Sequence, residues 1–298
     1  MVGKNKVDLQ LKEKYENEGI IIIKNFFSSK EVLELRNQIS NENFSPNRKY
    51  IGFDEISFAQ TLLNKIVNER LSSILNEIFI DPYIVPDFIL QLSNTPETLP
   101  RPHYDLQSYI RQGMSKVLLS KDLQYAKIGL YLQDSGKENP GSIWYVPKSH
   151  KFQIFRFIWK LRIKGIQTRL DTFVKKLFRK YQIPLNASSG DLAIFDGRLL
   201  HSSAPKILFT SKTELKKMSI YFSAVGSLKN ANNFMKNEIY KLADEINSKD
   251  PDDCQRIGYF FGSLSSILKN HCSHLDLKFF SLDSKFLNSN KNKIEKAF

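Results

Sequence analysis

Short apolar stretches separated by turn residues occupy the middle of this 298-residue sequence, and they restrict its fold more than any other feature. Asn139-Pro140-Gly141 and Ser189-Gly190-Asp191 are typical turns between such stretches. The stretches have the length of strands and are too short to be independent helices. The sequence therefore predicts a mainly β fold, a sandwich or a barrel, with strands over residues 86–92, 127–133, 142–146, 191–195 and 217–225.

Helices are expected to flank these strands. Residues 7–18 are charged and compatible with a helix, and the β-branched run Ile20–Ile23 that follows them predicts a buried strand. Ser28-Ser29 marks the start of a second helix, with Ser29 as its predicted N-cap. A further helix is expected over residues 58–79, and the polar segment after about residue 228 is also predicted to be helical.

Cysteine content and the length of apolar runs indicate the compartment in which the chain works. The two cysteines, Cys254 and Cys272, cannot form a disulfide framework, and residues 1–10 lack the apolar core of a signal peptide. The longest apolar run, Gly19–Ile23, is far shorter than the roughly 18 residues that a membrane-spanning helix requires. These features predict a cytoplasmic protein without a transmembrane segment.

Basic residues concentrate in one segment of the chain. Residues 151–180 hold ten Lys or Arg and one acid, Asp171, so this segment carries +9 of the formal net charge of +13. An apolar face over residues 170–177 predicts an inserted helical segment at about 151–183, with a basic face. That face can be a solvated surface, a lid that attracts an anionic substrate, or a peripheral contact with an anionic membrane. Nucleic acid is not expected, because no recognised binding motif accompanies the charge.

His103-Tyr104-Asp105 is the strongest candidate for chemistry in the sequence. In an extended strand, residues i and i+2 point to the same side, so this His and Asp can bind one metal ion. His201, which follows the apolar segment 191–195, is the best candidate for a third ligand. Two histidines and one carboxylate on one face of an octahedron leave the other positions open, which is the usual arrangement in non-haem Fe(II) oxygenases.

Four stretches around these residues resemble the phytanoyl-CoA dioxygenase family, which includes ectoine hydroxylase. Their order and spacing agree with the family over roughly residues 10–225. The resemblance implies a double-stranded β-helix (a cupin-like jelly-roll) that binds Fe(II), 2-oxoglutarate and O₂ and hydroxylates a C–H bond of a small molecule. The four stretches are Gly19–Phe27 with the helix after it, Pro102–Asp105, Asn139–Lys151, and Gly190–Phe195 followed by His201–Pro205.

The resemblance also implies a domain plan and a catalytic centre. Residues 1–298 would form a single oxygenase domain with its core at about 10–228, the basic insert at about 151–183, and a helical C-terminal extension at about 228–298. His103, Asp105 and His201 would be the metal ligands and the catalytic centre. Related halogenases have a small residue in place of the carboxylate ligand, so Asp105 favours hydroxylation over halogenation.

The residue expected to hold the far carboxylate of 2-oxoglutarate departs from the family. Most members have an Arg at the position of Lys212, which here lies in a polar stretch. If the loop is a few residues longer, Lys216 takes the position of that Arg, and Lys217 is the second choice. Arg101 and Arg198 are possible substitutes. A Lys neutralises a carboxylate as a point charge and lacks the bidentate fork of Arg.

Further contacts are implied with less support from the motifs. Ser203, Tyr109 and Gln91 match positions that contact 2-oxoglutarate in the family. Arg101, Arg198 and Trp144 are candidate substrate contacts, although Trp144 suits the core of a strand better. His150 belongs to a motif in which the corresponding histidine is mainly structural.

Two other functions are compatible with the sequence. The chain could be a catalytically silent β-helix binding module, for which the altered Arg position is the supporting feature. It could also bind a membrane or a nucleic acid through the basic insert at 151–183. The intact set of three candidate ligands favours the enzyme over both, because a binding module has no chemical need for three converging ligands.

Overall fold

The structure, a computed structural model, divides the chain into two compact units. One unit contains residues 1–49, 91–119 and 126–220, and the other contains 50–90, 120–125 and 221–298. All three candidate metal ligands belong to the first unit. The residues that the structure describes are 8–44, 50–93, 102–106, 120, 122–136, 143–151, 178, 180–203, 217–234, 272, 274–275 and 277–279.

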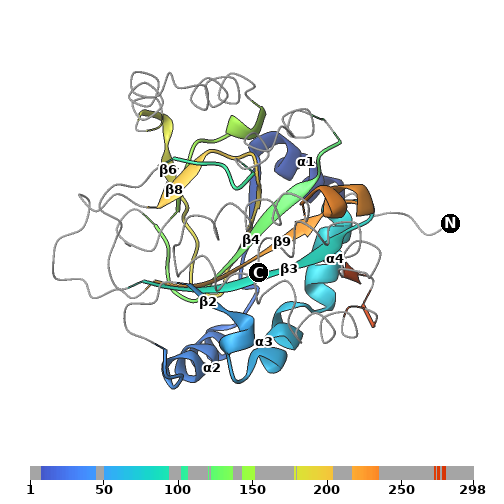
Figure 1. Ribbon diagram of the computed structural model, residues 1–298. Helices are drawn as coiled ribbons and strands as arrows, with labels where there is room; N and C mark the ends of the chain where they lie inside the picture. The colour runs from blue at the N-terminus through green and yellow to red at the C-terminus, as the bar shows by residue number, and fades with distance from the viewer. Residues whose placement is uncertain are drawn as a thin grey trace, which may run out of the picture. The chain divides into compact units, whose positions relative to one another are not determined.

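Antiparallel strands form the core of the first unit (Figure 1). β7 (Leu192–Asp196) pairs with β1 (Ile20–Ile23) on one side and with β4 (Tyr125–Tyr131) on the other. Every residue of β7 is buried, as expected for a strand with a neighbour on each side. β9 (Lys217–Val225) follows β4 in the sheet, where the backbone N–H of Leu132 donates to the Met218 carbonyl at 3.0 Å.

A second, smaller sheet carries one of the candidate ligands. Its order is β6 (Ile183–Pro184), β5 (Ile143–Tyr145) and β8 (His201–Ser203), with antiparallel pairing throughout. In this register Tyr145 lies opposite His201 and Trp144 lies opposite Ser202. Residues that lie opposite each other share a face of the sheet. His201 and Trp144 therefore belong to opposite faces.

The helices of the first unit are α1 (Asp8–Glu18) and α2 (Ser29–Ser40), with a short 3₁₀ helix, η2 (Ser149–Lys151). The prediction that Ser29 caps α2 is wrong, because Ser28 is the N-cap. The Ser28 hydroxyl accepts from the backbone N–H of Glu31, whose carboxylate accepts from the Ser28 N–H at 2.8 Å. This reciprocal capping box satisfies two backbone donors at once, and Ser29 lacks an acidic residue at the matching distance.

The second unit has its own helices and strands. They are β2 (Tyr50–Gly52), the 3₁₀ helix η1 (Phe53–Glu55), α3 (Ala59–Ile66), α4 (Glu69–Ile78), β3 (Tyr83–Ser93) and β10 (Lys278–Phe279). β10 runs parallel to β3. Phe88 stacks on Phe222 with ring centroids 4.6 Å apart and contacts Phe53 at 5.3 Å, which forms part of an apolar core.

The single helix expected over residues 58–79 is in fact two helices. α3 ends at Ile66, and Asn68 adopts an extended conformation as the N-cap of α4. The Asn68 side chain accepts a hydrogen bond from the Leu71 N–H at 2.9 Å, so it starts a new helix instead of continuing the old one.

The predicted strands are confirmed as β3, β4, β5, β7 and β9, and Ile20–Ile23 is confirmed as β1. Most of the basic insert and most of the C-terminal extension lie outside the described residues, so the single-domain plan stays a prediction. Within the part of the chain that the structure describes, no helix is long and apolar enough to cross a membrane.

Candidate metal centre

His103, Asp105 and His201 converge on one point, although Asp105 and His201 are 96 positions apart in the sequence. One ligand atom from each of the three lies within 4.8 Å of the other two. The rings of His103 and His201 have centroids 4.4 Å apart. Asp105 Oδ1 lies 3.7 Å from His201 Nε2, which is too long for a hydrogen bond. Among the described residues, no other group of three such side chains comes together in this way.

The backbone places these side chains. The N–H of His103 donates to the His201 carbonyl at 2.8 Å, and the N–H of His201 donates to the His103 carbonyl at 3.0 Å. This reciprocal pair fixes the register between the 102–106 segment and β8. Tyr104 points away from the ligands and packs in a buried apolar cluster with Trp144, Val146, Phe178 and Leu200. The alternation predicted for His103-Tyr104-Asp105 is therefore present.

His201 is held as a neutral imidazole in one tautomer. Its Nδ1 lies 2.9 Å from the Leu199 carbonyl oxygen. A carbonyl can only accept, so Nδ1 carries the proton and Nε2 presents a lone pair toward Asp105. Burial, followed by the neighbouring His103, lowers the pKa of His201 to about 4. A histidine that stays neutral at physiological pH has its lone pair available for a metal ion.

The Asp105 carboxylate provides the test of whether a cation fits here. Its Oδ2 atom is buried and has no hydrogen-bond partner. A buried carboxylate oxygen without a donor is costly, and a divalent cation at this point would satisfy it. Two imidazole nitrogens and one carboxylate oxygen form the donor set preferred by non-haem Fe(II). The residues therefore fit a ferrous ion.

A second polar pair lies on β9. Lys217 is buried at the start of the strand, and its ammonium group contributes to the lowered pKa of His201, so it lies within electrostatic reach of the candidate ligands. Ser219, two residues on and on the same face of the strand, is completely buried, and its hydroxyl has no hydrogen-bond partner. A cation and a hydroxyl side by side are suited to bind a carboxylate. Sequence reasoning missed Ser219, although the Lys-x-Ser spacing on a predicted strand could have indicated it.

The other predicted cosubstrate contacts are distributed unevenly. Ser203 is half-buried on β8 and shares a face with His201. Gln91 is half-buried on β3 and belongs to the same compact unit as the candidate ligands. Lys216, Tyr109 and Arg101 lie outside the described residues.

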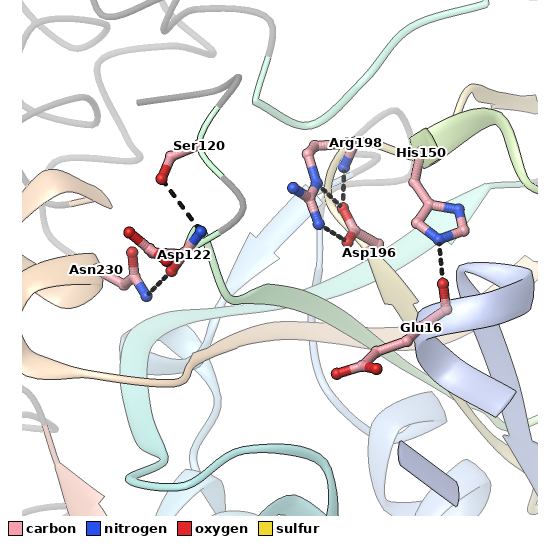
Figure 2. Close-up of polar contacts among 7 residues, drawn as sticks. All are labelled: Glu16, Ser120, Asp122, His150, Asp196, Arg198 and Asn230. Atoms are coloured by element: carbon pink, nitrogen blue, oxygen red, sulfur yellow. Dashed lines mark hydrogen bonds and ion pairs between the residues drawn. The ribbon is translucent and has the colours of Figure 1, made fainter. Parts of the chain in front are cut away.

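Arg198 and Trp144 have contacts that favour structural roles. The Arg198 guanidinium is bound to the Asp196 carboxylate, with Nη2 2.5 Å from Oδ2 (Figure 2). Trp144 is buried in the cluster with Tyr104. In the smaller sheet it lies on the face opposite to that of His201.

His150 lies outside the ligand group. It is buried, and its Nε2 is 2.9 Å from the Glu16 carbonyl oxygen at the end of α1 (Figure 2). Burial lowers the pKa of His150. The contact between η2 and α1 supports the structural role predicted for this residue.

Comparisons with known proteins agree with this geometry. The family model for phytanoyl-CoA dioxygenase (PhyH) matches residues 15–207. No curated protein matches the chain. HygX from Streptomyces hygroscopicus with iron bound is a similar solved structure, with a TM-score of 0.52 and 17% identity over 76% of this chain and 88% of HygX. HygX with nickel and 2-oxoglutarate bound has a TM-score of 0.50 and 17% identity over 76% of this chain and 89% of HygX. The likeness shows the fold and confirms the predicted double-stranded β-helix.

Proposed function

Since the chain belongs to the phytanoyl-CoA dioxygenase family, we propose that it is a 2-oxoglutarate-dependent iron enzyme that hydroxylates a C–H bond of a small-molecule substrate. The observation that carries this proposal is the convergence of His103, Asp105 and His201 within 4.8 Å. The uncompensated Oδ2 atom of Asp105 supports it, because a bound cation would satisfy that oxygen.

His103, Asp105 and His201 would hold the metal ion, and the protein's contribution is to keep their donor atoms ready. When bound, iron together with 2-oxoglutarate and O₂ supplies the oxidation: the cosubstrate becomes succinate and CO₂, and one oxygen atom enters a substrate C–H bond. The Leu199 carbonyl keeps the proton of His201 on Nδ1, so that Nε2 faces the ion. Asp105 adds one negative charge, which partly neutralises a divalent cation.

Lys217 and Ser219 would bind the far carboxylate of 2-oxoglutarate. Both are buried on one face of β9, where a charge-assisted hydrogen bond is stronger than in water. Together they replace the two-pronged guanidinium of most family members with one ammonium and one hydroxyl. Ser203, on the same face of β8 as His201, is a further hydroxyl for the cosubstrate.

Apolar side chains lie beside the candidate ligands and would limit the access of water to a bound ion. The Phe195 ring lies edge-on to His201 with centroids 5.3 Å apart, and Phe195 is buried on β7. Tyr104, which lies between His103 and Asp105 in the sequence, belongs to the buried apolar cluster that also contains Trp144. Exclusion of water strengthens the electrostatic interactions inside a site and limits unproductive reactions.

Formation of succinate tests the proposal. Purified protein, loaded anaerobically with Fe(II) and supplied with 2-oxoglutarate and O₂, is expected to produce succinate, and His201→Ala is expected to produce none. Candidate substrates that accelerate succinate formation would be examined for a product 16 mass units heavier. A wild-type protein that binds 2-oxoglutarate and Fe(II) yet forms no succinate would favour the silent binding module instead.

We further propose that the substrate is a small molecule and that the protein does not bind nucleic acid. The basic insert at 151–183 would either attract an anionic substrate or contact an anionic membrane surface. The charge of this segment supports both roles. A reducing compartment such as the cytoplasm suits a ferrous enzyme. Cys272 is a buried free thiol whose pKa is raised by burial to about 12, so it is poorly suited to disulfide exchange.

A further inference from the structure

The turn from Asp196 to His201 connects the end of β7 to the start of β8 and carries one of the candidate ligands. We propose that the ion pair between Arg198 and Asp196 positions His201 and thereby sets the affinity of the centre for metal. This inference rests on the proposed function. It assigns Arg198 a positioning role in place of the substrate or cosubstrate contact expected from the sequence.

The ion pair joins residues two positions apart, is largely buried, and uses both carboxylate oxygens of Asp196. Arg198 Nε lies 2.8 Å from Asp196 Oδ1, and Nη2 lies 2.5 Å from Oδ2. The backbone N–H of Arg198 also donates to Oδ1, at 2.8 Å (Figure 2). The Arg and Asp side chains are 15% and 4% exposed, so solvent competes little with these contacts. A bidentate fork combined with a backbone bond fixes the direction of the chain as it leaves β7.

Leu199 links the ion pair to the imidazole. Its N–H donates to the Asp196 carbonyl at 2.8 Å, and its carbonyl accepts from His201 Nδ1 at 2.9 Å. Movement of the segment 196–198 would therefore move the carbonyl that orients the His201 ring. The Gly197 carbonyl also accepts from the Leu106 N–H at 3.4 Å, which ties the turn to the residue after Asp105.

The next residue of the turn is held by Ser149 of η2 and by Val146, the residue after β5. Leu200 donates its N–H to the Ser149 hydroxyl at 2.8 Å and accepts from the Val146 N–H at 2.9 Å. The Leu200 N–H and carbonyl are both held, and the ion pair holds the start of the turn. His201 therefore has little rotational freedom. Metal affinity depends strongly on such outer contacts, because ligands that are already oriented lose less entropy on binding.

The surroundings of the ion pair support a specific role. Tyr15 of α1 lies close by: burial raises the pKa of its hydroxyl, and the Asp196 carboxylate raises it further. Burial works against the charge of Arg198, whereas Asp196 raises the pKa of the guanidinium. Replacing a buried ion pair by apolar residues is often neutral or stabilising, so stability alone is weak grounds for placing one here. Asp196 lies five residues and Arg198 three residues before His201, and this position gives the ion pair a second role.

The experiment measures metal affinity in Arg198→Gln and uses Lys24→Gln as its matched control. Each variant removes the cation that pairs with a carboxylate at one end of β7, and each carboxylate keeps a backbone donor. Fe(II) is titrated anaerobically by calorimetry, and the visible spectrum of the Co(II)-loaded protein reports ligand geometry. Arg198→Gln is expected to weaken metal binding by about 10- to 100-fold and to change the Co(II) spectrum. Lys24→Gln should leave both unchanged.

Arg198→Lys adds a conservative test. A Lys keeps the charge but cannot form the fork, so its metal affinity is expected to fall between those of the wild type and Arg198→Gln. If Arg198→Gln does not fold, Arg198→Lys decides, and a wild-type affinity in that variant overturns the inference. Wild-type affinity in a folded Arg198→Gln, or an equal loss in Lys24→Gln, also overturns it. In either case the proposed function survives, whereas a wild-type protein that binds no metal overturns both.

Discussion

The two ends of β7 use the same chemistry for different purposes. Before the strand begins, the completely buried Asp191 accepts from Lys24 Nζ at 2.7 Å, from the Asn25 N–H at 2.9 Å and from the Ser188 N–H at 2.7 Å. At the last residue of the strand, Asp196 accepts from Arg198 and from the Arg198 backbone. Both ends therefore have a buried carboxylate, a basic partner and a backbone donor.

The two ends differ in what they hold in place. Asp191 joins the end of β1 to the turn before β7, so its bonds connect two structural segments. Asp196 and Arg198 start the turn that ends in His201. The Lys24 side chain is 58% exposed, whereas that of Arg198 is 15% exposed, so solvent screens the first pair more than the second. The geometry of such an ion pair alone does not show whether it connects two structural segments or positions a candidate ligand. The residues next to it in the fold do.

The largest effect is expected from replacing His201 itself. His201→Ala is expected to reduce Fe(II) affinity by more than the roughly 100-fold limit typical of residues outside the ligand set, because it removes a ligand outright. Succinate formation should stop. His274→Ala, which changes an exposed histidine of the other unit, should bind Fe(II) as the wild type does. Fe(II) calorimetry on both variants gives the answer, and equal affinities would contradict the assignment.

Replacing Lys217 is expected to separate cosubstrate binding from metal binding. Lys217→Met is expected to weaken 2-oxoglutarate binding by about 30-fold or more, since loss of one partner of a buried charge pair costs at least about 2 kcal/mol. Fe(II) affinity without 2-oxoglutarate should stay close to that of the wild type. Lys217→Arg should restore binding. Calorimetry of 2-oxoglutarate with the metal-loaded variants tests this, and undiminished binding by Lys217→Met would exclude Lys217 from the cosubstrate site.

Ser149→Ala tests whether the hydrogen bond from the Leu200 N–H to Ser149 also helps to position the turn between Asp196 and His201. The Leu200 N–H would lose its acceptor inside the protein, at an expected cost of about 1–3 kcal/mol in the free energy of unfolding. Fe(II) binding should also weaken several-fold. Ser135→Ala is the control, because it removes another buried serine hydroxyl, one that donates to the Leu185 carbonyl at 3.0 Å, well away from the turn in sequence. Urea unfolding and Fe(II) titration of both variants should show similar instability but a metal defect only in Ser149→Ala.

The two buried histidines, His201 and His150, make the free energy of unfolding depend on pH. The folded-state pKa of His201 is about 4, below the ordinary value of about 6.5, so the unfolded chain binds more protons near pH 6. The stability contributed by neutral His201 is complete above about pH 6.5 and is lost as the pH falls toward 4. Between pH 7.5 and 5.5 this loss is about 1 kcal/mol in the metal-free protein. The lowered pKa of His150 acts in the same direction.

Urea unfolding at the two pH values measures this dependence. His150→Gln should show a smaller loss of stability between them than the wild type. A free energy of unfolding that does not change between pH 7.5 and 5.5 would show that these histidines are not held neutral.

Lys24→Gln is expected to have the smallest effect. Its ion pair is more than half exposed on the lysine side, so the free energy of unfolding should fall by no more than about 1 kcal/mol. A loss of several kcal/mol, measured by urea unfolding, would show that solvent screens this end of β7 less than its exposure indicates.

Much of the strand pattern could be predicted because alternation and turn residues are local properties. The start of α2 and the break between α3 and α4 were predicted wrongly, because in each case one capping side chain among several candidates decides where the helix begins. The spacing of Ser28 and Glu31 could have given the correct start of α2. Ser28 rather than Ser29 caps α2 because Glu31 stands at the matching distance. Asn68 starts α4 because its side chain accepts from the Leu71 N–H, and α3 has already ended at Ile66.

The sequence was sufficient to identify the candidate ligands, but not the contacts that bring them together. His103 and Asp105 follow from strand alternation, whereas the approach of His201 depends on backbone pairing between segments about one hundred residues apart. Loop length determines whether Lys216 or Lys217 matches the Arg of the family, and the sequence does not give that length. The sequence offered Arg198 as a possible cosubstrate or substrate contact, because its ion pair with Asp196 forms only in the folded turn.

Anomalous diffraction at the iron edge, from crystals grown anaerobically with Fe(II) and 2-oxoglutarate, shows directly whether His103, Asp105 and His201 bind iron. We expect one strong peak at about 2.0–2.2 Å from a ring nitrogen of His103, a ring nitrogen of His201 and a carboxylate oxygen of Asp105. A peak bound elsewhere, or no peak from iron-saturated protein, would contradict it.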